Sequence, residues 1–120
     1  MNRIIIPLPL MTLNEYTNKQ RINRYAGANA KKQSTRICQT HVKSAMNCGV
    51  RFEPPFRLKF TWYCKDKRQD PDNIAFQKKF VLDGMVKAGF IENDGWQQVL
   101  GFEDYFEVDK RNPRVEIEVI

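Results

Sequence analysis

The chain has 120 residues, 42% of them hydrophobic and 28% charged, with a net charge of +6; this predicts one small globular domain over residues 1–120. No apolar run reaches the roughly 20 residues of a membrane span, and no segment resembles a signal peptide, so we expect a cytoplasmic protein. Three widely spaced cysteines and a single histidine, His41, argue against a zinc site and against a Ser-His-Asp or Cys-His nucleophile, and favour buried, reduced thiols.

The chain begins with a predicted strand and helix. Residues 3–10 are apolar and extended in character, and two prolines push them toward a sheet edge or a bend. Thr12 and Glu15 form a Thr-x-x-Glu capping box, which predicts a helix running through about Tyr25. Gly27 then permits a break.

A second, basic helix is expected over residues 28–47, with Gly49 as its stop. From residue 16 to residue 52 there is no Asp or Glu, which is unusual for a helical face that merely contacts water. Such a one-sided charge predicts contacts to the phosphates of a nucleic acid, although a solubilising basic face is the plainer alternative. The cations in the two helices are Lys19, Arg21, Arg24, Lys31, Lys32, Arg36 and Lys43.

The second half predicts three strands and one helix. Apolar and polar residues alternate over 56–64, the clearest strand pattern in the chain. A helix is expected from about residue 71 to residue 88, and Gly89 ends it. Further strands are expected over 99–108 and 114–120. The order β-α-α-β-α-β-β predicts an α+β fold with a mixed sheet and helices mainly on one side.

Two acids mark the start of the helix expected at residue 71. Asp70 precedes Pro71, which favours an extended backbone and an N-cap position, and Asp72 falls in the first turn. Acids at a helix N-terminus stabilise its dipole and need no metal. Paired carboxylates are also ligands for a hard divalent cation, so both interpretations stand at this point.

Helical geometry favours the metal site. An apolar stripe identifies the core face, and Lys79 lies opposite it on nearly the same bearing as Asp72, two turns away. Lys79 is therefore placed to reach a phosphate, although an i, i+4 pair with Asp83 is also expected. Asp94, in the loop after the helix, offers a third carboxylate. The stripe consists of Ile74, Val81, Met85 and Ala88.

As a set, these motifs resemble the RusA family of Holliday junction resolvases of bacteria and phages, over about residues 65–100. The resemblance implies a small α+β homodimer that cuts four-way DNA junctions by paired symmetric nicks, in DNA recombination and repair. It also implies Mg2+ as the cofactor, with Mn2+ as a substitute. The motifs that carry the resemblance are Asp70-Pro71-Asp72-Asn73-Ile74, Lys79, Leu82-Asp83-Gly84, Lys87-Ala88-Gly89-Phe90 and Asn93-Asp94 with Val99.

The resemblance assigns the metal-binding and catalytic roles to Asp70, Asp72 and Asp94, with Lys79 as the catalytic lysine. The segment between Asp72 and the Lys-Ala-Gly motif is about three residues longer than in the usual family pattern, so Lys78 is an alternative for that lysine. DNA would also be held by the basic helices and by a basic turn before the acids. The cations of that turn are Lys65, Lys67 and Arg68.

Two alternative functions remain open from the sequence. A non-catalytic DNA-binding protein, such as a phage regulator, explains the basic segment but leaves three acids that would repel DNA. A general nuclease of flaps or branched DNA fits the same residues. A restriction-type active site is disfavoured because no Glu-x-Lys or Asp-x-Lys tripeptide occurs. Four side chains near the acids have open roles: Asn73 as cap or ligand positioner, and Phe76, Phe80 and Trp96 as core, dimer or base contacts.

Overall fold

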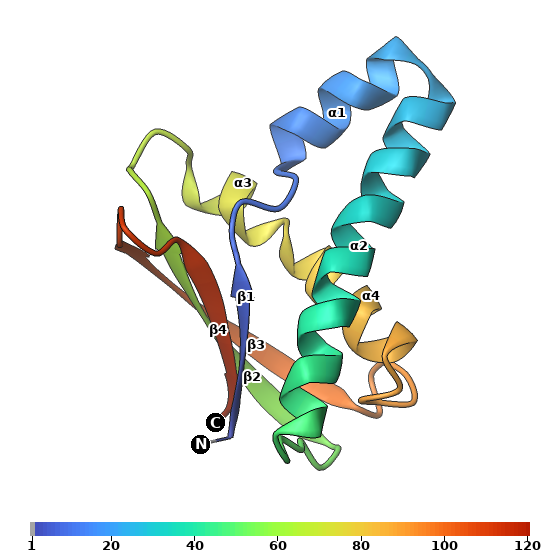
Figure 1. The fold of residues 1–120 in the computed structure, drawn as a ribbon, viewed down its shortest axis with the longest axis vertical. Helices are drawn as coiled ribbons and strands as arrows, with labels where there is room; N and C mark the ends of the chain where they lie inside the picture. The colour runs from blue at the N-terminus through green and yellow to red at the C-terminus, as the bar shows by residue number, and fades with distance from the viewer. Residues whose placement is uncertain (1) are drawn as a thin grey trace.

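Four strands form one mixed sheet, and helices lie against one of its faces (Figure 1). The computed structural model describes residues 2–120. The α+β class and the mixed sheet expected from the sequence are confirmed. The elements are β1 (Arg3–Pro7), α1 (Leu13–Ile22), α2 (Arg24–Asn47), β2 (Phe56–Cys64), α3 (Pro71–Ala75), α4 (Lys78–Lys87), β3 (Val99–Val108) and β4 (Arg114–Val119). The helices α2 and α4 lie against one face of the sheet, and α1 projects beyond the sheet.

The sheet has the strand order β1-β4-β2-β3, so β3 is an edge strand. β4 is antiparallel to both β1 and β2, whereas β3 is parallel to β2. The parallel register places Val99 beside Phe56 and Val108 beside Cys64. The two ends of β3 therefore lie at opposite ends of the sheet.

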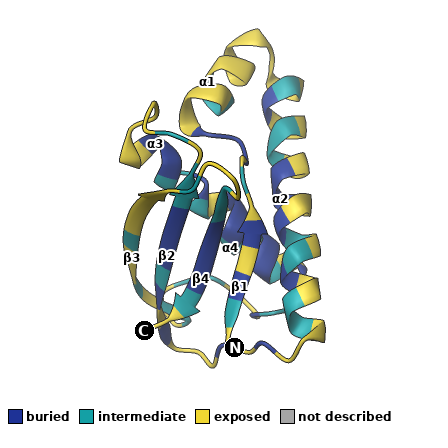
Figure 2. Ribbon diagram, turned by 60° about the vertical axis from the view of Figure 1, so that its left-hand side comes forward, coloured by how far each residue is buried: buried dark blue, intermediate teal, exposed yellow. Residues whose placement is uncertain are grey.

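The core lies between the sheet and the helices, because β2 alternates as its sequence predicts. The apolar residues of β2 point toward α2 and α4, and Figure 2 shows dark blue, buried segments along β2 and β4. Phe60 and Trp62 stack with ring centroids 5.6 Å apart. The fully buried side chains of this layer include Leu58, Phe60, Trp62, Phe80, Val81, Met85 and Ile117.

The capping box at the start of α1 is confirmed, but the predicted break at Gly27 is wrong. The Thr12 hydroxyl accepts a hydrogen bond from the Glu15 amide at 3.4 Å. The break falls instead at Asn23, whose side chain accepts from the Ala26 amide at 2.7 Å and caps α2. The side chain of Asn23 thus satisfies a first-turn amide of the next helix, which Gly27 has no side chain to do. Gly49, with φ +88°, ends α2 as predicted.

The single helix expected over residues 71–88 is also wrong, since α3 and α4 are separated at residues 76–77. Gln77 is buried, and its side chain accepts from the Leu10 amide at 3.0 Å and donates to the Ile74 carbonyl at 3.0 Å. The Gln77 and Lys79 amides make i to i−3 bonds there, so the turn is tighter than an α-helix. The side-chain directions expected for one continuous helix over residues 71–88 therefore do not apply beyond Phe76.

The sequence predicts three buried thiols. This is confirmed for Cys38, whereas Cys64 is only partly buried. The prediction is wrong for Cys48, which is exposed at the end of α2. All three are free. Burial, together with the nearby Asp83 carboxylate, raises the pKa of Cys38 to about 12. Within residues 2–120, no helix is both long and apolar enough to cross a membrane.

An ion-pair network joins β1 to β4 on the sheet face away from the helices. Arg114 donates to Glu116 at 2.7 Å and to Asp109 at 2.9 Å, and Arg3 donates to Glu116 at 2.6 Å. Burial by itself raises the pKa of Glu116, but the hydrogen bonds from Arg114 and Arg3 outweigh burial and leave the pKa lowered. The hydrogen bond from Arg114 likewise lowers the pKa of Asp109.

We expect this network to make the domain acid-sensitive. Because the pKa of Glu116 is lower in the folded chain than its ordinary value of 4.5, the stabilisation is present above that value and is lost as pH falls through the folded-state pKa. Urea unfolding at several pH values measures the slope, and Glu116→Gln should flatten it. The control is Glu118→Gln, which removes a looser pair with Lys59 at 3.6 Å. Equal slopes for native protein and Glu116→Gln would contradict this assignment.

Candidate active site

Asp70 and Asp72 lie at the start of α3 with exposed side chains. Asp70 has the extended backbone of an N-cap residue (φ −72°, ψ 151°) and Pro71 takes the first helical position, as predicted. Within the described chain, however, the Asp70 carboxylate makes no capping hydrogen bond. Asp72 Oδ1 accepts only from the adjacent Asn73 amide, at 2.9 Å. Helix capping therefore leaves most oxygen lone pairs of this acid pair available.

Asn73 anchors the acid pair to the start of α1. Its buried side chain accepts from the Asn14 amide at 2.9 Å and donates to Gln69 Oε1 at 2.8 Å. Asn73 thus caps the first turn of a different helix from its own, a role that sequence spacing does not reveal. Because Asn73 is bonded to the Asn14 amide, the backbone that carries the acid pair is held beside the base of α1, while the Asp72 side chain stays exposed.

The two candidate lysines occupy different environments. Lys79 is exposed, with 55% of its side chain accessible, and pairs with Asp83 at 3.4 Å, as its i, i+4 spacing predicts. Lys78 is largely enclosed. Its ammonium lies 2.6 Å from Asp104 on β3 and 4.5 Å from the ring centroid of Phe102. The Lys78 ammonium is occupied by its contacts with β3, whereas the Lys79 ammonium is accessible to a phosphate from solvent.

The Asp104 cluster was not found from the sequence. Asp104 accepts from Trp62 Nε1 at 2.9 Å as well as from Lys78, so three distant segments meet at one carboxylate. The register of β3 against β2 places Asp104 beside Phe60, and the packing of α4 on this face brings Lys78 to the same point. No local spacing encodes that register.

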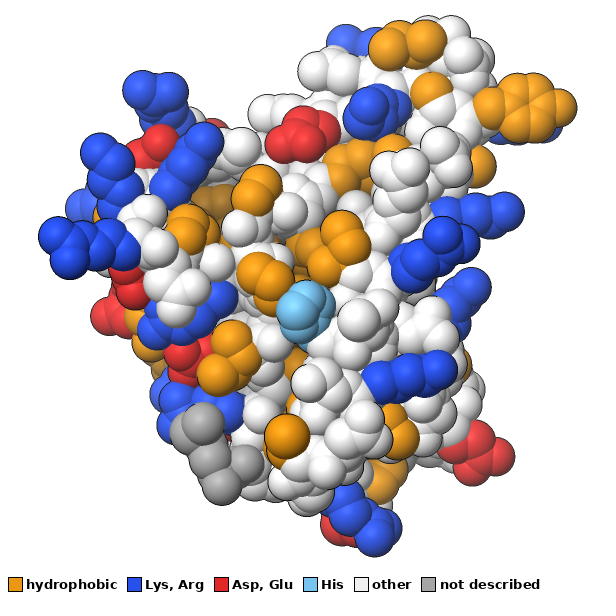
Figure 3. All heavy atoms as spheres, viewed as in Figure 1, with side chains coloured by type: hydrophobic (Ala, Val, Ile, Leu, Met, Phe, Trp, Pro, Cys, Tyr) orange, Lys and Arg blue, Asp and Glu red, His pale blue; other side chains and the backbone are white. Residues whose placement is uncertain are grey.

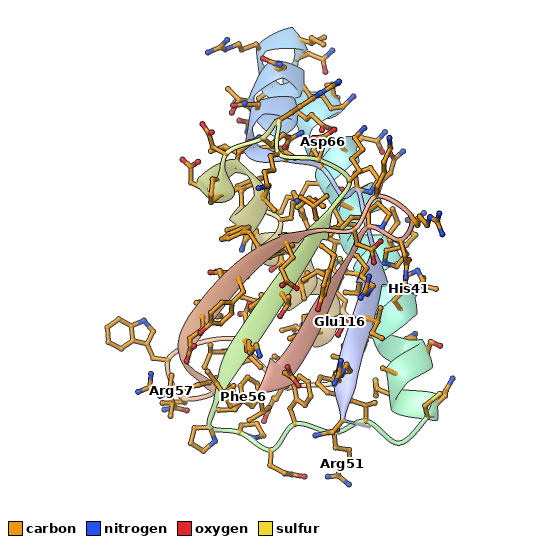
Figure 4. All side chains as sticks on the ribbon, turned by 90° about the vertical axis from the view of Figure 1, so that its left-hand side faces the viewer. His41, Arg51, Phe56, Arg57, Asp66 and Glu116 are labelled. Atoms are coloured by element: carbon orange, nitrogen blue, oxygen red, sulfur yellow. The ribbon has the colours of Figure 1, made fainter. Side chains whose placement is uncertain are left out.

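Asp94 lies far from the other two acids within one chain. It lines a hollow at residues 99–102, at the start of β3, whereas Asp70 lines a hollow at residues 106–108, at the strand's end. These positions are roughly 20 Å apart along the strand. Figure 4 shows Asp66, near the acid pair, and Phe56 at opposite ends of the sheet. Among residues 2–120, no three His, Cys, Asp or Glu side chains come together as a metal site.

A hollow of about 270 Å3 lies beside Asp70, between the β2–α3 loop and the end of β3. Asp66 and Glu107 line it with Asp70, as does Lys67. Asp66 also accepts from the Arg68 amide at 3.0 Å, which shapes this basic loop. Asp66 and Glu107 could not be identified from the sequence, because their approach to Asp70 depends on the turn between β2 and α3.

The predicted DNA-binding cations lie on two projections on either side of α3. Figure 1 shows α3 between the β2–α3 loop and the α1–α2 hairpin, and Figure 3 shows Lys and Arg side chains along the outer edge of α2 and around the loop. Nine of these ten cations are exposed, and Lys31 is partly buried. They are Lys19, Arg21, Arg24, Lys31, Lys32, Arg36, Lys43, Lys65, Lys67 and Arg68.

The aromatic residues whose roles the sequence leaves open, Phe76, Phe80 and Trp96, lie in different surroundings. Phe80 is buried in the core, and Phe76 is partly buried, with its ring centroid 5.6 Å from that of Phe80 and 5.8 Å from that of Tyr16. The core interpretation is therefore confirmed for Phe80 and fits Phe76. Trp96, two residues after Asp94, is 96% exposed.

The edge strand β3 carries an apolar stripe that the helices of its own chain leave uncovered. Side chains at alternate positions share a face of the strand, and Phe102 contacts Phe60, so this face is the helix side of the sheet. Leu100, for example, is 54% exposed. The apolar members of the stripe are Leu100, Phe102, Phe106 and Val108, and the intervening Asp104 is neutralised by Lys78.

A known protein family matches nearly the whole chain. The family model for endodeoxyribonuclease RusA matches residues 8–120, a span that contains every element from α1 to β4 and all three acids. No curated protein matches the chain. Nucleases of the matched family depend on a metal ion, and their substrate is Holliday junction DNA. The chain belongs to the RusA family of Holliday junction-resolving endodeoxyribonucleases.

Proposed function

We propose that this protein resolves four-way DNA junctions by paired symmetric nicks, with Mg2+ held by Asp70, Asp72 and Asp94. The observation that carries the proposal is the Asp70 carboxylate: it stands at a helix N-terminus, makes no capping bond within the described chain, and lies between two basic projections. Two carboxylates in such surroundings repel the phosphates of DNA unless a cation lies between the carboxylates and the DNA. Oxygen ligands of this kind suit Mg2+, and Mn2+ is expected to substitute.

Each residue has a distinct task in this site. Asp70 and Asp72 supply carboxylate oxygens from a rigid helix start, because Asn73 fixes that start against α1. The bound cation supplies charge that polarises the phosphodiester and favours ionisation of an attacking water. Lys79 donates to the phosphate oxygens as their negative charge grows. Its exposed ammonium, paired only loosely with Asp83 at 3.4 Å, is available for that contact.

The cations hold the arms of the junction through their phosphates. They flank the acids on both sides, so a strand crossing α3 contacts the β2–α3 loop and the α1–α2 hairpin together. Phosphate contacts position DNA without reading its sequence. We expect junction affinity to fall steeply with salt. We propose the cytoplasm of a bacterial or phage-infected cell as the location of the protein, because a DNA substrate is found there.

The distance between Asp94 and the acid pair points to a homodimer. Carboxylates that share one cation must lie within about 5 Å of each other, so Asp94 reaches the site only from a second copy of the chain. Antiparallel pairing of two β3 edges about a two-fold axis brings the start of one strand, near Asp94, to the end of the other, near Asp70. The same pairing covers the exposed apolar stripe on β3.

Cleavage of a synthetic four-way junction tests the proposed activity. In Mg2+, the native protein should nick opposite strands symmetrically and leave linear duplex intact. Asp72→Asn removes one ligand charge while keeping the side chain's shape, so nicking should fall by at least about a hundredfold. Junction binding should persist, because within residues 2–120 the Asp72 carboxylate accepts a hydrogen bond from the adjacent Asn73 amide and makes no other bond that holds the fold.

The control variant is Asp83→Asn on α4, which removes a carboxylate that only pairs with Lys79. Asp83→Asn should keep junction cleavage within a few-fold of the native rate. Equal cutting of flaps and four-way junctions would identify a general nuclease of branched DNA. Binding without cutting at any Mg2+ or Mn2+ concentration would refute the assignment of the acids.

A further inference from the structure

The α1–α2 hairpin is an arm that projects beyond the sheet (Figure 1). None of the ten residues of α1, all within the described chain, is buried, and the helix packs mainly on α2. Tyr16 is partly buried against the core, whereas Leu13 and Ile22 on the same helix are exposed and offer a surface that another molecule can cover. The base of the arm is tied to the acid pair by the Asn14–Asn73 hydrogen bond. The arm therefore presents its tip at a fixed position relative to the active site.

The tip of the arm exposes two large apolar side chains. Ile22 is 72% and Tyr25 is 85% accessible, on either side of the single connecting residue Asn23. The Asn23 cap, 2.7 Å from the Ala26 amide, fixes the backbone around Tyr25. An exposed aromatic ring on a capped helix start is a rigid platform whose apolar faces are left in water.

A shallow hollow of about 480 Å3 adjoins this ring and has the chemistry of a nucleobase site. The aromatic ring offers a stacking face, the amides of Asn23 and Asn29 offer hydrogen-bonding groups, and Lys32 offers a cation for the adjoining phosphate. No acid occurs between residues 16 and 52, so beyond Glu15 at its base the arm has no carboxylate to oppose an anionic ligand. The lining residues are Asn23, Tyr25, Ala26, Ala28, Asn29 and Lys32.

We propose that Tyr25 stacks on an unpaired base of branched DNA, and that the arm thereby selects branch points over continuous duplex. This inference rests on the proposed function, because it names how the same site distinguishes its substrate. In linear duplex every base is already stacked, and Tyr25 then contacts only the outer surface of the helix. At a branch point the terminal base pairs are more easily unstacked, so the ring gains a partner.

The length of the arm suits this role. The ten residues of α1 span about 15 Å, and Asn73, next to Asp72, holds their beginning. A base held at the tip therefore lies a few nucleotides from the phosphate at the acids. The arm then helps to set the position of the cut relative to the branch point.

The test measures branched and linear DNA side by side at one salt concentration with Ca2+ in place of Mg2+. A four-way junction with 2-aminopurine at the branch point reports base stacking by its fluorescence, and the same label in a linear duplex is the reference. Tyr25→Ala should bind the junction about tenfold more weakly, with unchanged duplex affinity. Tyr25→Phe, which keeps the ring, should retain junction affinity and the fluorescence change of the native complex.

Lys43→Ala is the matched control, since it removes an exposed cation of the same helix α2 that lies far from the tip. It should weaken junction and duplex binding equally and lower the salt dependence. Equal losses on both DNAs for Tyr25→Ala, or no loss on either, would overturn the proposal. A changed oligomeric state in Tyr25→Ala would instead assign the tip to a contact between chains, which also overturns it.

The outcome is separable from that of the proposed activity. A native protein that fails to cut the junction in Mg2+, yet loses junction affinity on Tyr25→Ala, would refute the nuclease assignment and keep the stacking site. Normal cutting combined with an unaltered preference in Tyr25→Ala would refute the stacking site alone. Because Tyr25 is exposed, its substitution should leave thermal unfolding unchanged.

Discussion

Mixing Asp70→Asn protein with Asp94→Asn protein should restore DNA nicking that neither variant shows alone. Each variant by itself should lose at least about a hundredfold in cleavage rate, because each removes a ligand charge from every active site. In a mixed dimer, one site receives both substituted residues and the other receives none. The intact site then combines Asp70 of one chain with Asp94 of the other.

The expected recovery of nicking activity follows from the fraction of dimers that are mixed. At equal concentrations half of the dimers are mixed and each holds one intact site, so about a quarter of the native site concentration returns. The products should be single nicks rather than paired cuts, because the second site of each mixed dimer is inactive. Cleavage of a junction with one labelled strand at a time measures this directly.

The complementing pair has an internal control. Asp70→Asn mixed with Asp72→Asn removes two acids contributed by the same chain, so every mixed dimer has one defect in each site and no nicking returns. Recovery in that mixture, or its absence in the Asp70→Asn and Asp94→Asn mixture, would contradict a site shared between chains. The geometric basis is the roughly 20 Å between the segments of β3, residues 99–102 and 106–108, that line the hollows beside Asp94 and Asp70.

Gly84→Ala should destabilise the fold, although alanine is the better helix former. A methyl group on Gly84 would lie 2.6 Å from Cys38 Cβ and 2.9 Å from the backbone nitrogen of Gln39, where α4 crosses α2. Backbone atoms of a buried helix cannot move aside without separating the two helices. We expect a loss of about 1–3 kcal/mol in the free energy of unfolding, which exceeds the gain of about 1 kcal/mol from helix propensity.

Gly27→Ala is the matched control, because Gly27 also lies within a helix, α2, but meets a side chain that can move. Its added methyl group would lie 2.7 Å from Gln20 Cγ, and Gln20 is exposed. Helix propensity should then dominate, so Gly27→Ala should be neutral or stabilising by up to about 1 kcal/mol. Urea unfolding of the two variants measures the difference. Equal effects of one sign would show that close helix packing does not require Gly84.

Much of the fold is legible in the sequence because it is encoded over short distances. The period-2 alternation of residues 56–64 predicts the buried strand β2, and the Thr12–Glu15 capping box predicts the start of α1. Gly89, with φ +77°, ends α4 where the sequence places the end. Each of these features depends on residues within one or two turns of one another.

The errors arise where a distant contact decides local geometry. The single helix expected over 71–88 divides because Gln77 bonds to the Leu10 amide, 67 residues away in sequence. The α1–α2 break falls at Asn23 rather than Gly27, because the Asn23 side chain caps α2 at the Ala26 amide and Gly27 packs against Gln20 within the hairpin. Local propensity is a weak guide wherever tertiary bonds compete with it.

In the candidate site, too, features that depend on neighbouring residues could be predicted from the sequence, and features that depend on distant contacts could not. The sequence by itself determined the acid pair, since Asp70 and Asp72 are neighbours on one helix start, and it determined the basic character of α1 and α2. Only the tertiary structure decided where Asp94 stands, because the parallel register of β2 and β3 places the two ends of β3 at opposite ends of the sheet. Residues that share a turn are held together by the local backbone, whereas residues on different elements meet only where strand register and chain pairing bring them.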